Sequence, residues 1–220
     1  DNDMYQKTEW LQQRYDRMWH RIKHVSCQSL KGAAVITVEG TMGAPSFNPD
    51  FSTALTFTVD SHGAIRVDAA LTPLRPDKLC HLPRFGMLMD LDRRFDTVSW
   101  YGRGPHENYS DFKESALISQ YSKKVAAMDE VYIRPQENGT RSDVSRFVLT
   151  DRNGNAVLFC PEKPLSFSVH HYDQYSLADK THHWEVQDER LTQVAIDGFM
   201  CGLGNQSCGF PPLDPYRVIP

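Results

Sequence analysis

The sequence of 220 residues carries a formal net charge of -4 and is long enough to bury a substantial hydrophobic core. It is short for a (β/α)₈ barrel, which takes roughly 250 residues. It contains no basic stripe, no apolar stretch near the ~20 residues of a membrane span and no N-terminal signal segment, so we expect neither a nucleic-acid nor a membrane partner.

The cysteines indicate reduced thiols. There are five, odd in number and scattered, without a C-x-x-C motif: Cys27, Cys80, Cys160, Cys201 and Cys208. Neither a zinc cluster nor a disulfide scaffold is therefore expected. Because the chain begins at Asp1 rather than Met, an upstream signal would not be visible, and we leave the location open between bacterial cytoplasm and periplasm.

Residues 1–24 form a lead-in segment in which a helix is predicted. The large apolar residues from 10 to 22 recur at helical spacing: Leu11, Tyr15, Met18 and Ile22. Thr8 is placed as the N-cap of this helix.

After Val25 the apolar pattern changes to a period of two, which is typical of strands. We predict strands at 34–38, 54–59, 65–69, 85–89, 97–101, 145–150, 156–160, 165–169 and 191–196. Polar turns at 60–64 and 151–155 make hairpins of two adjacent pairs. The pattern favours an all-β antiparallel sandwich with Trp100 in its core, and we treat 25–220 as one domain.

Five ordered motifs carry the information about function. Two glycine-framed loops, Gly102–Tyr109 and Arg134–Arg141, each combine charge, amide and a rigid turn. Pro83–Gly86 precedes them, and Ile196–Phe199 and Gly202–Gly209 follow them. Several motifs in one order are more specific than any one alone. Together they resemble the C-terminal domain, of the small-chain or domain 5 type, of family 2 glycoside hydrolases of the β-galactosidase type.

The resemblance implies a large antiparallel β-supersandwich of the galactose-mutarotase-like kind over 25–220, with 1–24 as an alternative interdomain segment. It also implies that both catalytic glutamates lie on a barrel in another domain. We therefore expect no glycoside hydrolysis by this chain alone, no cofactor or metal in it, and Mg or Na only in other domains of the full enzyme.

The resemblance further implies the partners. These are the catalytic barrel domain or a separate large subunit of the same enzyme, and a galactoside substrate whose terminal β-D-galactose the whole enzyme removes. The chain would complete the active-site pocket, take part in assembly and bind carbohydrate, in a full enzyme expected to be an oligomer.

Eleven residues of the signature loops are assigned structural roles: Arg84, Gly104, Pro105, Glu107, Asn108, Tyr109, Pro135, Glu137, Asn138, Gly139 and Arg141. Glu107 and Glu137 could in principle form an acid/base pair. The favoured interpretation is that each fastens a loop by accepting backbone N–H groups or a guanidinium from Arg103 or Arg141.

The loop after the last predicted strand is the candidate substrate-pocket loop. Its candidate residues are Asn205, Ser207, Cys208, Gly209 and Phe210. In the resembled family this loop supplies a Trp that stacks on sugar, but Cys208 and Gly209 occupy that place here, which leaves Phe210 as a substitute. Cys208 has no neighbouring base and is not expected to be a nucleophile. An ordinary glycine-rich turn is the alternative.

Two other functions stay open at this point. A stand-alone aldose 1-epimerase would use His106, His170 or His171 with a carboxylate as acid and base, and a free carbohydrate-binding module would need no catalytic group. The pair His170–His171 is not expected to bind a metal, because adjacent side chains on a strand point to opposite faces.

Overall fold

The computed structural model describes residues 4–206 and 208–220, and it is all-β, with three four-stranded antiparallel sheets in the described part. The chain divides into two compact units, one reaching to Leu82 and including Ile219–Pro220, the other spanning Pro83–Val218. This boundary lies inside the range 25–220 that the sequence analysis treats as one domain. No helix in the described residues is long and apolar enough to cross a membrane.

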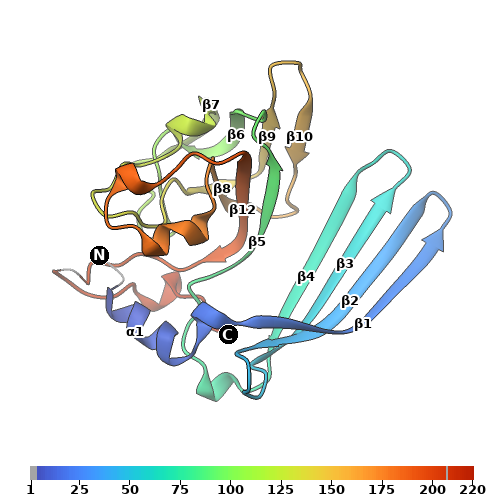
Figure 1. The fold of residues 1–220 in the computed structure, drawn as a ribbon, viewed down its shortest axis with the longest axis horizontal. Helices are drawn as coiled ribbons and strands as arrows, with labels where there is room; N and C mark the ends of the chain where they lie inside the picture. Colours follow the sequence, from blue (N-terminus) through green and yellow to red (C-terminus); the bar gives the residue numbers. More distant parts are fainter. Residues whose placement is uncertain (1–3, 207) are drawn as a thin grey trace. The chain divides into compact units, whose positions relative to one another are not determined.

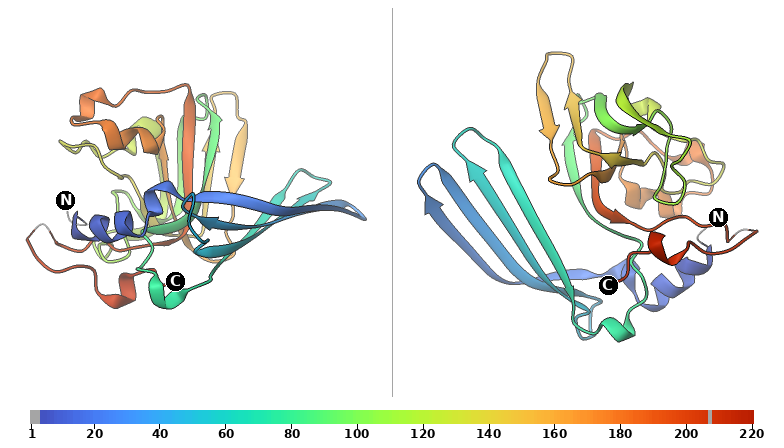
Figure 2. Two further views of the ribbon diagram at one scale, coloured as in Figure 1. Left: turned by 60° about the horizontal axis from the view of Figure 1, so that its bottom comes forward. Right: turned by 180° about the vertical axis from the view of Figure 1, so that it is seen from behind.

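The first unit is an up-and-down sheet preceded by short helices (Figure 1). Its elements are α1 (Met4–Gln12), η1 (Tyr15–Arg17), β1 (Trp19–Leu30), β2 (Ala33–Gly43), β3 (Phe51–Asp60), β4 (Ile65–Pro73) and η2 (Pro76–Lys78). The strands follow one another in the order β1-β2-β3-β4, and they lie side by side in both views of Figure 2. The predicted hairpin over 54–69 is confirmed as β3 and β4.

The helix predicted over 10–22 is wrong in its second half. The helix α1 ends at Gln12, Thr8 lies inside it rather than at its N-cap, and Trp19 already pairs with Gly43 as the start of β1. Four apolar residues at helical spacing are too short a signal to outweigh twelve residues of strand pairing. A register shift between Ile22 and His24 further blurs the period of two.

One face of this sheet is apolar across all four strands. Val25 lies opposite Val38, Val38 opposite Leu55, and Leu55 opposite Ala69. Because side chains alternate along a strand, every second residue of each strand joins this face. Ile65, on the same face, is 60% exposed.

The second unit is a sandwich of two sheets, ordered β5-β12-β11-β8 and β10-β9-β6-β7. Its strands are β5 (Arg84–Asp92), β6 (Thr97–Gly104), β7 (Leu117–Lys124), β8 (Arg141–Val144), β9 (Arg146–Thr150), β10 (Ala156–Phe159), β11 (Leu165–His170) and β12 (Leu191–Met200). Short helical turns complete it: η3 (Val125–Ala127), η4 (Gln174–Asp179), η5 (His183–Glu185) and η6 (Asp214–Tyr216).

Aromatic residues from both sheets form the core between them. Phe147 of β9 stacks on Phe167 of β11 with ring centroids 4.3 Å apart, and Trp100 of β6 meets the same ring edge-on. All three side chains are almost completely buried. The prediction that Trp100 belongs to the core is confirmed, and this core fixes the ends of the strands from which the site loops emerge.

Candidate functional site

Asn108 joins the first signature loop to the second. Its N–H donates to Thr140 O at 2.9 Å, and its side-chain oxygen accepts the N–H of Ser142 at 2.9 Å. The Ser142 hydroxyl donates in turn to Asn108 O. Asn108 is completely buried. Since every polar group of this residue must find a partner inside the protein, an asparagine at this position ties both loops into one body.

The two glutamates occupy the junction of these loops. Glu107 accepts the N–H of Gly139 at 2.9 Å, and Glu137 accepts the Thr140 hydroxyl at 2.7 Å. Tyr109 donates its hydroxyl to Glu137 at 2.8 Å and lies 3.4 Å from Glu107. Both glutamates thus hold loop residues together. Their donors are a backbone N–H and hydroxyls rather than guanidinium groups.

The two arginines expected near the glutamates have other partners. Arg103 binds Asp143 at 2.7 Å, and Arg141, completely buried, donates to Gly139 O at 2.8 Å. Of the two kinds of donor expected, Glu107 has the backbone N–H, Glu137 has hydroxyls instead, and neither glutamate is bound by these guanidinium groups in the described part of the chain. Asp143 is held between Arg103 and Lys113, whose hydrogen bonds outweigh its burial and lower the pKa of its carboxyl.

Burial dominates the electrostatics at the junction. Loss of solvation raises the pKa of Glu137 above that of an ordinary glutamate, although Arg84 and two hydroxyl donors oppose the shift. Burial and the two glutamates likewise raise the pKa of Tyr109. The tyrosine thus keeps its proton and serves as a hydrogen-bond donor to the carboxylates.

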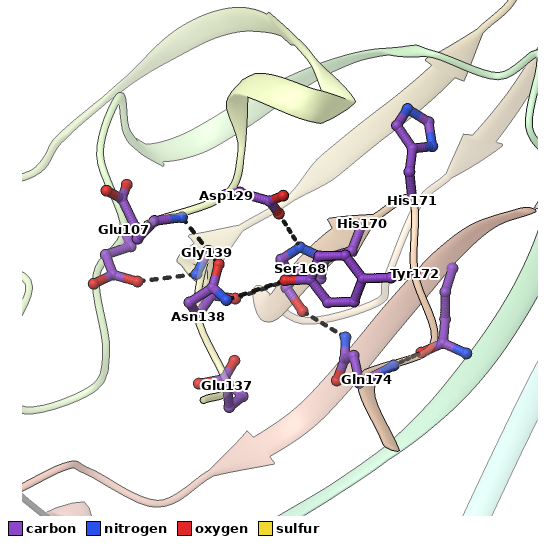
Figure 3. Close-up of polar contacts among 12 residues, drawn as sticks. Glu107, Asp129, Glu137, Asn138, Gly139, Ser168, His170, His171, Tyr172 and Gln174 are labelled. Atoms are coloured by element: carbon purple, nitrogen blue, oxygen red, sulfur yellow. Dashed lines mark hydrogen bonds and ion pairs between the residues drawn. The ribbon is translucent and has the colours of Figure 1, made fainter. Parts of the chain in front are cut away.

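Asn138 and His170 form a second buried group beside the glutamates (Figure 3). His170 Nδ1 lies 2.5 Å from Asp129 Oδ1 and its Nε2 lies 3.1 Å from Asn138 O, so both ring nitrogens face acceptors. Asn138 donates to the Tyr172 hydroxyl at 3.1 Å. At Gly139, where φ is +76°, a Cβ would lie 2.9 Å from the His170 ring. Only glycine fits this turn.

Arg84 anchors the start of β5 to β12. Its guanidinium forms a two-pronged contact with Asp197, with Nε to Oδ1 at 2.8 Å and a second bond from Nη2, and Nη1 donates to Gln174 at 3.1 Å. Asp197 is 1% exposed. Burial raises the pKa of Asp197 in spite of the guanidinium, so the pair is costly to desolvate and depends on its geometry.

The candidate pocket loop begins at Gly202 and presents its tip outward. Leu203 and Gly204 donate their N–H groups to Asp111 at 3.0 and 2.7 Å, and Asn205 N donates to Phe210 O at 2.8 Å. Phe210 is 85% exposed. Asn205, Cys208 and Gly209 are exposed too, while Ser207 lies outside the described residues.

A cleft of about 230 Å³ lies within the second unit. Its walls are Ser110, Lys113, Ser142, Asp143, Pro164, Leu165, Ser166, Gly198, Phe199, Met200, Pro215, Tyr216, Arg217 and Val218. Neither Glu107 nor Glu137 belongs to these walls. The glutamate junction and the cleft are therefore separate features.

The histidines considered for epimerase chemistry have separate surroundings. His106 lies in the first signature loop, 3.1 Å from the Ser115 hydroxyl, whereas His170 faces Asp129 and is 1% exposed. His171 contacts Thr192, and burial lowers its pKa. None of the three shares a hydrogen-bond partner with another in the described part of the chain. No group of three or more metal-binding side chains occurs among the described residues.

Sequence reasoning missed Asp111 and Asp129, and it named Asp197 only within the motif Ile196–Phe199, without a partner. Asp111 is 92 residues from Leu203, Asp129 is 41 from His170 and Asp197 is 113 from Arg84. Separations of this size leave no local spacing to recognise. The available signals were the position of Asp111, two residues after the first signature loop, and the place of Asp197 in the motif Ile196–Phe199.

Fold and site together define an all-β protein with a two-sheet sandwich, whose two signature loops are joined by Asn108 and by glutamates and which exposes one glycine-rich loop. The chain belongs to the family described as Beta galactosidase small chain, which matches residues 1–220. The resemblance stated from the motifs is thereby confirmed.

Curated relatives place this domain in longer proteins. The chain is 27% identical over 219 residues to a Beta-galactosidase of Actinobacillus pleuropneumoniae, covering 100% of this chain and 21% of the relative. It is 27% identical to a Beta-galactosidase of Staphylococcus xylosus, covering 99% and 22%. It is 33% identical over 158 residues to Beta-galactosidase 2 of Enterobacter cloacae, covering 72% and 14%. The chain thus spans about a fifth of the length of the first two relatives.

Proposed function

We propose that this chain is the non-catalytic C-terminal domain of a β-galactosidase, which completes the active-site pocket and assembles with the catalytic barrel. The observation that carries the proposal is the loop from Gly202 to Phe210. Its base is held by Asp111 while its tip, including Phe210, is exposed. A loop that is anchored at its base and exposes its described tip residues is suited to lining a pocket that another domain provides.

The engagement of Glu107 and Glu137 supports the non-catalytic role. A retaining glycosidase needs two carboxylates ~5 to 5.5 Å apart on either side of the substrate. Here one tyrosine hydroxyl contacts both glutamates, Glu107 also accepts an N–H from the other signature loop, and Glu137 also accepts a hydroxyl from its own loop. Opening this junction to a sugar would break the contacts that the glutamates make between the two signature loops.

Exposed apolar surface supports the assembly role. On the apolar face of the β1–β4 sheet, Ile22, Val25 and Ile65 are each more than half exposed. An apolar surface of this kind on a domain is typical of protein that packs against further protein. The partner in this proposal is the barrel, either in the same natural chain or in a separate large subunit, within an oligomeric enzyme.

The proposal leaves substrate chemistry mainly to the barrel. The galactoside would contact this chain only through the loop tip, where Phe210 offers an aromatic face and Asn205 an amide. The chain itself would hold no cofactor, and Mg or Na would bind in the other domains of the enzyme.

Domain replacement tests the proposal. The segment of the Actinobacillus pleuropneumoniae β-galactosidase that matches this chain is exchanged for residues 1–220, and hydrolysis of a chromogenic β-galactoside is measured. We expect the exchanged enzyme to be active, the relative lacking the segment to be inactive, and the isolated chain to be silent. Activity of the isolated chain that Glu107→Gln abolishes would refute the non-catalytic assignment.

A further inference from the structure

We propose that Asp111 is the positioning residue of the pocket loop: through two backbone hydrogen bonds it sets the shape in which residues 202–210 meet the rest of the enzyme. The catalytic half of this inference rests on the proposed function, whereas the contact itself concerns the chain alone. Its carboxylate connects the turn that follows the first signature loop to the base of the pocket loop.

The two hydrogen bonds are specific to a carboxylate. Oδ1 accepts the N–H of Leu203 at 3.0 Å and Oδ2 accepts the N–H of Gly204 at 2.7 Å. Consecutive backbone N–H groups that point to one side form a small anion-binding concavity. A side chain with two equivalent acceptors and no donor fills it, whereas an amide would present an NH₂ group to one of the two N–H groups.

The backbone on both sides of the contact is adapted to it. A Cβ at Gly202 would lie 2.6 Å from Asp111 Cγ, so the carboxylate occupies the space that a side chain would need. Gly204 has a φ of +67°, a conformation that costs glycine little. The glycine at 202 is thus explained by the close approach of the aspartate, and the glycine at 204 by its positive φ and by Pro212, which lies 2.6 Å from where a Cβ would be.

The position of Asp111 is in turn fixed by the glutamate junction. Tyr109 and Phe112 exchange two backbone hydrogen bonds, at 3.1 and 2.9 Å, which places Ser110 and Asp111 at the tip of a tight turn. The hydroxyl of Tyr109 is held by Glu137. One series of contacts therefore runs from the second signature loop through the first to the base of the pocket loop.

Hydrogen exchange on the intact chain tests the contact. In Asp111→Asn we expect the amides of Leu203 and Gly204 to exchange roughly tenfold faster or more, because a charged acceptor is lost from both. Gly202→Ala, which displaces the carboxylate sterically, should give the same local signature. Unchanged protection in both variants, or faster exchange throughout Pro83–Val218, would overturn the inference.

Asp60→Asn is the matched control. Asp60 also accepts two backbone N–H groups, from His62 and Ala64 at 2.8 and 2.9 Å, but in the turn between β3 and β4. Both N–H groups bind Oδ1, which asparagine keeps, so the substitution should change exchange in that turn little and leave residues 202–210 unchanged. An equal effect of Asp60→Asn on the pocket loop would mean that the signal reports general loosening, which would also overturn the inference.

The domain-replacement β-galactosidase described under the proposed function tests the effect of Asp111 on catalysis. Asp111→Asn should raise KM for the chromogenic galactoside roughly threefold to tenfold with a smaller change in kcat, since a displaced loop weakens binding without touching the glutamates of the barrel. Asp60→Asn should leave both constants unchanged. Equal constants in Asp111→Asn and the parent would overturn the positioning role. If the domain-exchanged enzyme without further substitution is inactive, the proposed function is refuted. The hydrogen-exchange measurement would still show whether Asp111 holds the loop.

Discussion

Arg84 and Arg93 make the same two-pronged contact with an aspartate in different surroundings. Arg84 faces Asp197, whose side chain is 2% exposed, whereas Arg93 binds Asp188 with side chains 37% and 58% exposed. Removing one member of a buried pair leaves a charge without compensation, while an exposed pair is screened by water. The contribution of each pair to stability thus follows from burial rather than from hydrogen-bond geometry.

We expect Arg84→Met to lower the free energy of unfolding by about 3–5 kcal/mol and Arg93→Met by less than about 1 kcal/mol. Urea denaturation of the two variants measures both. The loss in Arg84→Met should shrink at acid pH, because protonation neutralises the buried Asp197 that has lost its partner. Equal losses in the two variants would contradict the role of burial.

The raised pKa of Glu137 makes the free energy of unfolding depend on pH, with a sign that follows from the direction of the shift. Because burial raises its pKa, the folded chain binds a proton that the unfolded chain has already lost. The stability this proton contributes is present at acid pH and is lost as the pH rises through the raised pKa. The Glu137→Gln variant has no charge to desolvate. Its free energy of unfolding should therefore increase relative to that of the parent as the pH rises.

Denaturation of the parent and of Glu137→Gln between about pH 4 and about pH 8 measures this difference. Subtracting the two curves of unfolding free energy against pH cancels the contributions of the other titrating groups. The difference should favour the variant more at the alkaline end. Thr150→Ser, at a strand position away from the junction, provides a control whose difference from the parent should not vary with pH. A difference that moves the other way would show that the hydroxyl donors outweigh burial.

At the scale of single residues, the sequence identified both partners where the two signature loops meet, such as Glu107 and Gly139, but did not pair the loops with distant carboxylates. Glu107, Asn108 and Asn138 could be selected because they stand in recognisable loops. Asp111 and Asp129 could not, and Asp197 could not be paired with Arg84 although it stands in a motif, because each contact exists only after segments distant in sequence have been brought together. A hydrogen-bond partner across the fold is a property of topology, which local pattern does not encode.

Among the elements, strands with clear alternation were predicted and strands without it were not. All nine predicted strand segments lie within observed strands apart from end residues, including the hairpin of β9 and β10. The strand β7 was missed because its residues are mostly exposed and polar, and β8 because it has four residues and includes the buried Arg141. Short strands with no apolar side to bury leave no periodic signal.

The stacked rings of β9 and β11 predict where the sandwich is most sensitive. Phe167 is completely buried between Phe147 and Trp100, so Phe167→Ala should lower the free energy of unfolding by about 3–5 kcal/mol. Phe199→Ala in β12 is the control, since this ring is 63% exposed and should cost less than about 0.5 kcal/mol. Chemical denaturation measures both, and similar losses would mean that the sheets do not pack through these rings.

For the whole molecule, the boundary between the compact units raises the question of which part folds by itself. The core cluster of the second unit runs from Phe95 to Val194, and the site contacts from Arg84 to Tyr216 fall in the same unit. Two packed sheets with a shared aromatic core meet the requirement for independent stability. The four-stranded sheet of the first unit instead presents an apolar face with exposed side chains.

We therefore expect residues 83–218 expressed alone to unfold cooperatively, and Phe167→Ala to destabilise them by the same amount as in the 220-residue chain, within about 0.5 kcal/mol. Denaturation followed by both fluorescence and circular dichroism measures this, and the two signals should coincide. Transitions that separate, or a Phe167→Ala effect that disappears, would mean that residues up to Leu82 are needed to complete the core. In that event the loop held by Asp111 would depend on the entire chain, because its anchoring turn and the sandwich would no longer form a unit of their own.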